Sequence, residues 1–358
     1  MHCATPRSGC RASASSRRSI STRSSGFSAT SCAMTPDPRR LPPARIETVS
    51  GTILMPMAPG RGHACGVLDA EGRAVPAART RIGPRRFTAD PLAPADMPDV
   101  LPGCWLYAGV GRHHFGHFLL EALPRLWALD HPGAPRPDGI ALVPMAGRDI
   151  AAVLARRLGP LLDILGQGLP VHLIQRPTRV DVALVPSQGF GHREWSHGTP
   201  EARAYMRRHL CAAVAPDGPE RLYVSRRRLK NPAQQVPHER RIEKWMSRGG
   251  YGIVHPERHS IVEQIACYRA ARVIVGPDGS AFHLAPFVMD TEARVGLIQR
   301  RTRQTSFDAI VRQVAGFAGI TPWTTAALAR LPVPTEDTSA LPPELYQLRR
   351  ELQAARFL

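Results

Sequence analysis

The sequence has 358 residues, of which 43% are hydrophobic and 21% charged, as expected for a globular protein with two domains. Its net charge of +18 suggests a nucleic-acid-binding protein, but residues 1–45 hold eight arginines against one acid, Asp37, so we expect no specific nucleic-acid partner. The seven cysteines show no C-x-x-C spacing, and no apolar run approaches the roughly 20 residues of a membrane-spanning helix. These features argue against a disulfide scaffold, a zinc knuckle and an integral membrane protein.

The first 33 residues are rich in serine and arginine and contain no acid. Transit peptides share this composition with upstream DNA that is translated in error. Because Met34 opens a more ordinary sequence, we expect it to be the true start and residues 1–33 to be dispensable, with a targeting segment as the alternative. We therefore assign residues 1–45 to a disordered or misassigned extension.

From Ile46 onward, short apolar runs such as Ile140–Val143 and Val182–Val185 indicate strands between helical segments. We predict a first α/β domain over residues 46–190, on the acceptor side of any site between the domains. The stretch Ser187–Pro200 is rich in glycine, histidine and serine and interrupts the periodicity, which is typical of a connection between domains.

The second half alternates short strands with helices, a pattern that predicts an α/β fold with a doubly wound parallel sheet over residues 191–325. The tail, residues 326–358, is expected to hold a short helix. The predicted strands are Arg221–Ser225, Gly252–His255, Arg272–Val275 and Arg294–Ile298, and the helices are Glu201–Ala213, His238–Ser247, Ser260–Ala270 and one that opens at Ser280 or Ala281. Because ligands bind outside the carboxyl ends of parallel strands, the loops after these strands are expected to share one edge.

The first cluster of candidate residues lies in RHHFGHFLLEALPRL, residues 112–126. His117, Glu121 and Arg125 recur at i, i+4 and i+8 and would line one face of a helix, which Pro124 is expected to kink. A solvated face with an ordinary Glu–Arg pair explains the same spacing. His113 and His117 also have the spacing of metal ligands, but no third ligand is evident. We therefore predict no metal.

The second cluster is YVSRRRLKNP, residues 223–232, in which a strand ends in three arginines. Guanidinium groups bind phosphate oxygens in pairs, so arginines at a strand end favour an anionic ligand. Arg226 and Arg227 would point to opposite sides if the strand continued through them, so we expect only one or two of the arginines to touch the ligand.

The third cluster is VIVGPDGSAFHLAPF, residues 273–287, where a strand, a turn and a helix start follow one another. Gly276 and Gly279 permit a tight turn and close approach of a ligand to the backbone. Free amides from Ser280 onward would bind an anion at the helix start. The motifs G-x-G-x-x-G and G-x-x-x-x-G-K-[ST] are absent, which disfavours the usual dinucleotide fold and phosphate-loop ATPases.

In this order and spacing, the three clusters resemble glycosyltransferase family 61, and Ser260–Gln264 and Phe287 add to the likeness. The family includes bacterial capsular-polysaccharide-type enzymes, the branch in which we place the chain, and eukaryotic xylosyl- and N-acetylglucosaminyltransferases. The resemblance covers residues 109–317. It implies two Rossmann-like domains in a GT-B arrangement and a nucleotide-sugar donor held mainly by the C-terminal domain.

The resemblance also implies inverting sugar transfer without a metal. We expect a UDP-linked donor, no other cofactor, and a glycan or lipid-linked saccharide as acceptor, in surface or capsular polysaccharide biosynthesis. The absence of a disulfide pattern favours the cytoplasm, and peripheral attachment to the inner face of the plasma membrane is left open.

In such a transfer, His117 is the expected base for the acceptor hydroxyl. Glu121 is the reserve base, or the group that orients His117, and Arg125 could pair with the acceptor or with that carboxylate.

At the donor, Arg226 and Arg227 would stabilise the departing diphosphate together with the helix start at Ser280. Glu263 is a candidate ligand of the donor ribose, although a capping box with Ser260 already explains it.

The chain departs from the family at Asp278. Many members carry a histidine between the two glycines of the last loop, whereas here the nearest histidine, His283, falls in the following helix. An aspartate beside a pyrophosphate would repel it unless the carboxylate turned toward an arginine, a donor hydroxyl or the acceptor. Asp278 could mark a different donor, a different division of roles, or a loss of activity.

Two functions of other classes compete with sugar transfer. A noncatalytic glycan- or nucleic-acid-binding protein would use the basic surface. A metal-dependent hydrolase would use His113, His114 and His117. Nucleotide-sugar affinity separates the first from an enzyme, and bound zinc in stoichiometric amount would identify the second.

Overall fold

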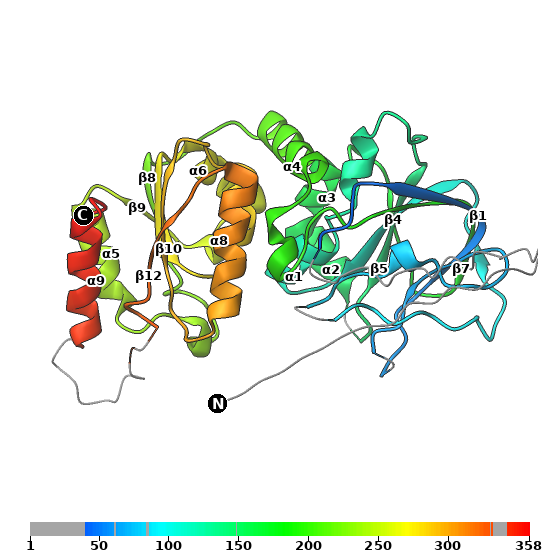
Figure 1. The fold of residues 1–358 in the computed structure, drawn as a ribbon, viewed down its shortest axis with the longest axis horizontal. Coiled ribbons are helices and arrows are strands. Elements are labelled where there is room, and N and C mark those ends of the chain that lie inside the picture. Colours follow the sequence, from blue (N-terminus) through cyan, green and yellow to red (C-terminus); the bar gives the residue numbers. More distant parts are fainter. Residues whose placement is uncertain (1–39, 61, 84–85, 148, 330, 332–341) are drawn as a thin grey trace, which may run out of the picture. The chain divides into compact units, whose positions relative to one another are not determined.

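A computed structural model describes residues 40–60, 62–83, 86–147, 149–329, 331 and 342–358 (Figure 1). The described residues belong to one compact unit, Pro38–Leu358. The expectations about Met34 and residues 1–33 fall outside the described residues. Of the predicted extension, the described part leads into the first strand, and the backbone amide of Arg45 donates to Ser187 Oγ at 3.2 Å.

The first sheet is mixed. Its described strands follow the order β2-β1-β7-β4-β5-β6, and β3 pairs with β7. Strands β7, β4, β5 and β6 run parallel, whereas β1 is antiparallel to β2 and to β7. The strands are β1 (Ile46–Met55), β2 (Gly66–Leu68), β3 (Asp99–Val100), β4 (Cys104–Gly111), β5 (Gly139–Pro144), β6 (Val171–Leu173) and β7 (Thr178–Pro186). The two strands predicted from sequence lie within β5 and β7.

The helices that follow the first sheet's strands are short, except α4. They are α1 (Phe115–Glu121), α2 (Ile150–Val153), α3 (Gly159–Leu165) and α4 (Pro200–Ala213). Thr199 caps α4 by accepting a hydrogen bond from the amide of Ala202, and Pro200 occupies the first turn, where no intrahelical donor is needed.

The second sheet is entirely parallel, in the order β12-β11-β10-β8-β9. In chain order this is 2-1-3-4-5, a doubly wound sheet whose direction of winding reverses between β8 and β10. The strands are β8 (Arg221–Val224), β9 (Gly252–Val254), β10 (Val273–Pro277), β11 (Arg294–Ile298) and β12 (Trp323–Thr325), and the helices are α5 (Glu239–Arg248), α6 (Ile261–Ala270), α7 (Ala281–Leu284), α8 (Gln304–Ala318) and α9 (Pro343–Ala354).

Helices cover both faces of this sheet: α5 and α9 lie on one side, α6 and α8 on the other (Figure 1). The alternation along β8 explains the arrangement, because successive side chains point to opposite faces. Tyr223 packs with α5 and α9, whereas Leu222 and Val224 belong to the core shared with α6 and α8. The predicted capping box of α6 is confirmed, with Ser260 Oγ accepting from the amide of Glu263 and the Glu263 carboxylate accepting from that of Ser260.

The predicted α/β class is therefore confirmed, and the two sheets are consistent with two Rossmann-like domains. The segment predicted to connect them contains a 3-10 turn, η4 (Arg193–His197), which packs against α8. Gly316 on α8 makes this packing possible, because an added Cβ would overlap the backbone of His197. No helix in the described part of the chain is long and apolar enough to cross a membrane.

Candidate active site

A cavity of about 560 Å³ lies where the end of β10 meets α1, η4 and the start of α8. Its wall carries four histidines and five arginines against one carboxylate: His114, His117, His192, His283, Arg193, Arg226, Arg300, Arg301, Arg303 and Asp278. A larger cavity of about 830 Å³ beside β12 and α9 is lined by no described histidine, arginine or cysteine. The histidines and arginines thus gather in the cavity of about 560 Å³.

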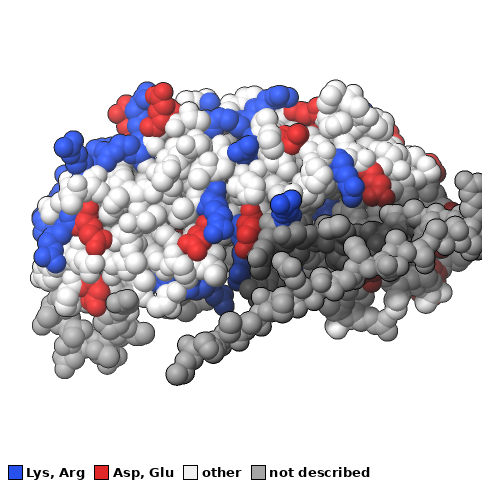
Figure 2. Space-filling view, viewed as in Figure 1, with Lys and Arg blue, Asp and Glu red and all other residues white. Residues whose placement is uncertain are grey.

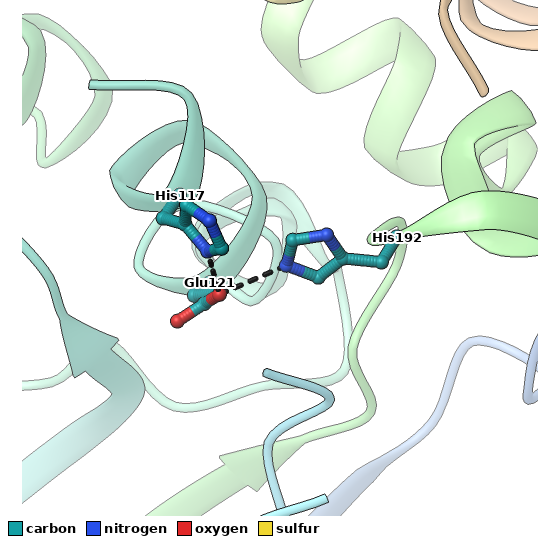
Figure 3. Close-up of side chains that lie close together, drawn as sticks. All are labelled: His117, Glu121 and His192. Carbon is teal, nitrogen blue, oxygen red and sulfur yellow. Dashed lines mark hydrogen bonds and ion pairs between the residues drawn. The ribbon is translucent and has the colours of Figure 1, made fainter. Parts of the chain in front are cut away.

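Two histidines share one buried carboxylate (Figure 3). Helix α1 places His117 one turn before Glu121, and the distance from His117 Nδ1 to Glu121 Oε1 is 2.7 Å. His192, from the segment before η4, approaches the same oxygen through Nε2 at 2.8 Å. Arg112 Nε lies 2.9 Å from the other oxygen, and the carboxylate has no exposed surface.

These contacts fix the protonation of the cluster. Burial raises the pKa of Glu121, but the hydrogen bonds from His117 and His192 and the charge of Arg112 outweigh it, so the pKa lies below its usual value. An ionised carboxylate only accepts hydrogen bonds, so both imidazoles donate to it. Burial holds the pKa of His192 below its usual value against the opposing effect of Glu121, which keeps this imidazole neutral. His192 Nδ1 is then left as an acceptor, and Nε2 is the ring nitrogen of His117 that does not contact Glu121.

The three histidines that a metal-dependent hydrolase was predicted to use do not form the candidate metal-binding group in the structure. In the described residues, the donor atoms close enough to share a metal ion belong to His117, Glu121 and His192, rather than to His113, His114 and His117. They bond to one another, and the guanidinium of Arg112 already neutralises the carboxylate. This donor set fits an oriented imidazole base better than a cation site.

Arg226 and Gly279 meet at the point where the second sheet reverses its winding. Arg226 follows β8 and Gly279 follows the neighbouring strand β10. A Cβ added to Gly279 would overlap Arg226 Nη1. The φ angle of Gly279 is not positive, so backbone conformation does not require a glycine here. Glycine is needed because the guanidinium packs on its Cα.

Replacing Gly279 by alanine is therefore expected to displace the Arg226 guanidinium and to weaken binding of a nucleoside diphosphate by about tenfold, with little change in stability. Calorimetric titration with UDP measures this. In an Arg226→Ala background, Gly279→Ala should cost no further affinity, because the two changes act through the same side chain. Additive losses would show that Gly279 contacts the ligand directly.

Asp278 does not face the cavity as an uncompensated charge. Its side chain is 3% exposed, Oδ1 accepts from the backbone amide of Arg300 at 2.8 Å, and Oδ2 lies 3.4 Å from Arg301 Nη2. The Asp278 carbonyl also accepts from Arg300 Nε at 2.9 Å. The carboxylate thus turns toward arginines, one of the arrangements in which it need not repel a diphosphate, and it holds the loop after β11 in place.

Ser280 also lines the cavity, ahead of helix α7. This helix has only four residues, Ala281–Leu284, before a 3-10 turn, so its dipole is weaker than the predicted longer helix would supply. Arg300 adds charge instead. Burial, followed by the neighbouring Arg226, lowers its pKa to about 10, which leaves it protonated at neutral pH.

Arg125 lies outside the cavity, although the helical spacing grouped it with His117. It is completely buried and donates to the carbonyls of Pro186, Ala77 and Arg79 and to Thr80 Oγ1. These bonds tie the end of β7 to the segment after β2. Helix α1 ends at Glu121, before Pro124, so Arg125 no longer continues the face that carries His117.

Three other predicted donor ligands lie away from this cavity. Arg227 pairs with Glu243 at 2.6 Å, Glu263 is taken up by the exposed capping box, and Gly276 packs inside β10, where a Cβ would overlap the Val224 carbonyl. The two arginines diverge, but β8 ends at Val224, so strand alternation does not extend to them and is not the cause.

A second cavity of about 250 Å³ adjoins the first and shares His114, Arg226, Gln234 and Ser280 with it. Gln264 lines this cavity. Its Nε2 donates to the carbonyls of Pro256 and His259 at 2.9 and 3.1 Å, which fixes Oε1 as an acceptor. Within the described residues, Gln264 Oε1 and Glu257 Oε1 are buried without a hydrogen-bond partner. Two such acceptors suit a ligand with hydroxyl or N–H donors.

Sequence reasoning missed four of these residues. His192 was present as one of several histidines in the predicted connection, and Arg300 in a loop expected at the correct edge. Glu257 fell in another of those loops, and Gln264 directly follows the glutamate that we favoured. The available signal was position at a strand end, which does not say which side chain turns inward.

The Glu239 side chain holds the backbone of Arg226 in place. Its Oε1 accepts from the Arg226 amide at 2.9 Å and from the Tyr223 hydroxyl at 3.2 Å. Burial raises the pKa of Glu239 from 4.5 to about 7, despite these hydrogen bonds. The folded protein therefore keeps this proton at pH values where the unfolded chain has lost it.

This difference predicts that Glu239 lowers the free energy of unfolding as pH rises from about 4.5 to about 7. Glu239→Gln removes the titration and keeps the shape. We expect the melting temperature of the wild type, relative to this variant, to fall between pH 5 and pH 8. Thermal unfolding of both proteins across this range gives the difference, in which the histidine titrations common to both cancel. A constant difference would contradict the assignment.

These features define an α/β protein with two Rossmann-like sheets, in which an oriented imidazole lies beside an arginine-rich cavity. The model of the family Glycosyltransferase 61 matches residues 115–296, about half of the chain. The chain belongs to this family and is therefore a glycosyltransferase. The match runs from α1 through β10 and includes His117, Glu121, Arg226 and Asp278. No curated protein matches the chain.

Proposed function

We propose that this chain transfers a sugar from a UDP-linked donor to a hydroxyl of a glycan or lipid-linked saccharide, with inversion and without a metal. The observation that carries the proposal is Arg226, which is shared by the two cavities. It lies between the unpartnered acceptors Glu257 and Gln264 of the 250 Å³ cavity and the oriented His117 of the 560 Å³ cavity. A nucleotide sugar has the same sequence of parts: nucleoside, diphosphate, sugar.

In this proposal the nucleoside occupies the cavity of about 250 Å³. Glu257 and Gln264 accept hydrogen bonds from its ribose hydroxyls or base N–H groups, and Phe115 and Leu229 contribute apolar wall. The diphosphate lies against Arg226 and Arg300. The sugar then extends into the cavity of about 560 Å³, toward His117.

Transfer begins when His117 Nε2 takes the proton of the acceptor hydroxyl. Glu121 holds the opposite ring nitrogen of His117 and stabilises the imidazolium that forms. The acceptor oxygen attacks the anomeric carbon as the bond to the diphosphate breaks, and the transition state gains oxocarbenium character. Arg226, Arg300 and the Ser280 amide stabilise the charge that develops on the diphosphate. Arg125, Arg227 and Glu263 act in this proposal through the fold rather than on the substrate.

A screen of UDP-, GDP- and CMP-sugars by thermal shift tests the proposal, because a ligand that binds the native state raises its melting temperature. We expect UDP-sugars to stabilise the protein and the other two classes to do so much less. No shift with any donor would contradict the proposal. Zinc in stoichiometric amount together with hydrolysis would instead favour the metal-dependent hydrolase.

The pathway and branch are part of the proposal: surface or capsular polysaccharide synthesis by a bacterial enzyme at the cytoplasmic face of the membrane. Helices α5 and α9 support this placement. They expose six cations that form no ion pair with a described acid: Arg240, Arg241, Lys244, Arg248, Arg349 and Arg350. Figure 2 shows basic side chains gathered over α9, at the left edge of the view. Such a surface is attracted to anionic headgroups.

We therefore expect sedimentation with vesicles that contain phosphatidylglycerol, and little with pure phosphatidylcholine. Lys244→Glu and Arg349→Glu should each reduce binding several-fold, and raised salt should do the same. Arg312→Glu, an equal charge change on an exposed residue of α8, is the matched control. Equal loss in all three variants would show that net charge, not this surface, governs binding.

A further inference from the structure

We propose that Arg193, together with Arg301 and Arg303, forms a second anion subsite in the cavity of about 560 Å³ that holds His117, and that this subsite binds a carboxylate or phosphate group of the acceptor. The inference rests on the proposed function, since it takes the cavity to hold donor and acceptor. It adds the chemical class of the acceptor, which neither the fold nor the family gives.

The charge of the cavity wall is the first argument. Five arginines face one carboxylate, Asp278, which already accepts from the loop after β11. A donor diphosphate carries two negative charges and is accounted for by Arg226 and Arg300. Arg301 has Asp278 as a counter-charge at 3.4 Å, whereas Arg193 and Arg303 form no ion pair with a described acid. A charge in a partly enclosed site is costly unless a partner arrives.

Arg193 carries the second argument. Within the described residues its Nε is buried and has no hydrogen-bond partner. The adjacent Glu194 is already committed, because its carboxylate lies 3.0 Å from Arg81 Nη2. A guanidinium donor that is removed from water and left unpaired suits an anionic ligand, which would accept from it.

The backbone gives a third argument. Arg193 has a φ angle of 54°, in the left-handed region that a long side chain seldom adopts. This conformation costs free energy, and it places the side chain in the wall of the cavity. The surrounding contacts hold the turn, since η4 starts here and packs against α8.

The position of Arg193 assigns the subsite to the acceptor. It directly follows His192, whose ring bonds to the carboxylate that orients His117. Arg301 and Arg303 line the cavity from the loop before α8. Helix α8 is also the helix against which η4 packs. The anion would therefore lie beside the base, where the acceptor enters, rather than at the nucleoside cavity.

The experiment uses the full chain saturated with UDP, so that the diphosphate site is occupied. The probes are methyl glucuronide, its neutral match methyl glucoside, and inorganic phosphate, each titrated by thermal shift. The proteins are the wild type, Arg193→Gln and the matched control Arg312→Gln, which changes an exposed arginine on α8 outside the cavity wall. Arg193→Gln keeps the strained backbone and a long polar side chain but removes the charge. Comparison with the control variant therefore separates loss of the subsite from general effects of salt and of folding.

We expect the glucuronide or phosphate to stabilise the wild type and Arg312→Gln, with no comparable effect of the glucoside. In Arg193→Gln the affinity for the same anion should fall about tenfold or more. A response to the glucuronide but not to phosphate identifies a carboxylate on the acceptor, and the reverse identifies a phosphate.

Equal responses to glucuronide and glucoside together with no effect of phosphate, or an unchanged anion response in Arg193→Gln, would overturn the inference. Failure of UDP itself to bind is a separate result, which would count against the proposed donor site. UDP binding without any second anion response would leave the transferase proposal standing and remove this subsite.

Discussion

Replacing His117 by alanine is expected to lower the turnover number about 100- to 10,000-fold while leaving the affinity for UDP unchanged. A general base acts on the transition state, and no part of the nucleotide reaches Nε2 in the proposed arrangement. Transfer kinetics with an identified acceptor, and calorimetric titration with UDP, measure the two quantities separately.

His131→Ala is the matched control, because His131 lies in the first domain outside both cavities. Glu121→Gln should also slow turnover, since it removes the charge that stabilises the imidazolium. Normal turnover in His117→Ala would make His117 a structural residue and leave His192, which bonds to the same carboxylate oxygen, as the next candidate base.

The second large effect is expected at the end of β8. Arg226→Ala should weaken UDP binding by about 1.5–3 kcal/mol, which is roughly ten- to 150-fold, because a charge-assisted hydrogen bond to the diphosphate is lost. Arg227→Ala, one residue further on, should leave UDP affinity nearly unchanged and lower the melting temperature instead. It removes the arginine partner of Glu243, whose side chain is only 11% exposed and which keeps its hydrogen bond from Ser225 Oγ.

Calorimetric titration of the two folded variants with UDP decides between them, and each serves as the other's control. The sequence predicted similar losses for both, since both follow the same strand. Equal losses would show that Arg227 reaches the ligand after releasing Glu243, whereas equal retention would remove the proposed diphosphate site.

Four of the five strands of the second sheet were predictable because their signals are local, whereas β12 and α8 were not predicted. Short apolar strands separated by amphipathic helices specify a parallel sheet, and a serine three residues before a glutamate specifies the start of α6. The first sheet was predictable only in part. Its antiparallel strand β1 pairs with β7, more than a hundred residues away, and no local pattern reports such a partner.

The same limit separates the site residues. The spacing of His117 and Glu121 on one helical turn predicted their proximity, and the structure shows the hydrogen bond. Periodicity also extended that face to Arg125, but α1 ends first and the guanidinium turns into the core. Helical spacing predicts neighbours only while the helix continues.

By itself, the sequence determined the α/β class, the strand ends whose loops line the cavities, and the pairing of His117 with Glu121. Only the tertiary structure decided that His192 joins this pair, that Arg226 rather than Arg227 lines the cavities, and that Asp278 turns toward arginines. Chain neighbours are set by backbone geometry, which a sequence pattern records. The direction of a side chain at a loop depends on the burial and partners that distant segments bring to it, and these exist only in the folded chain.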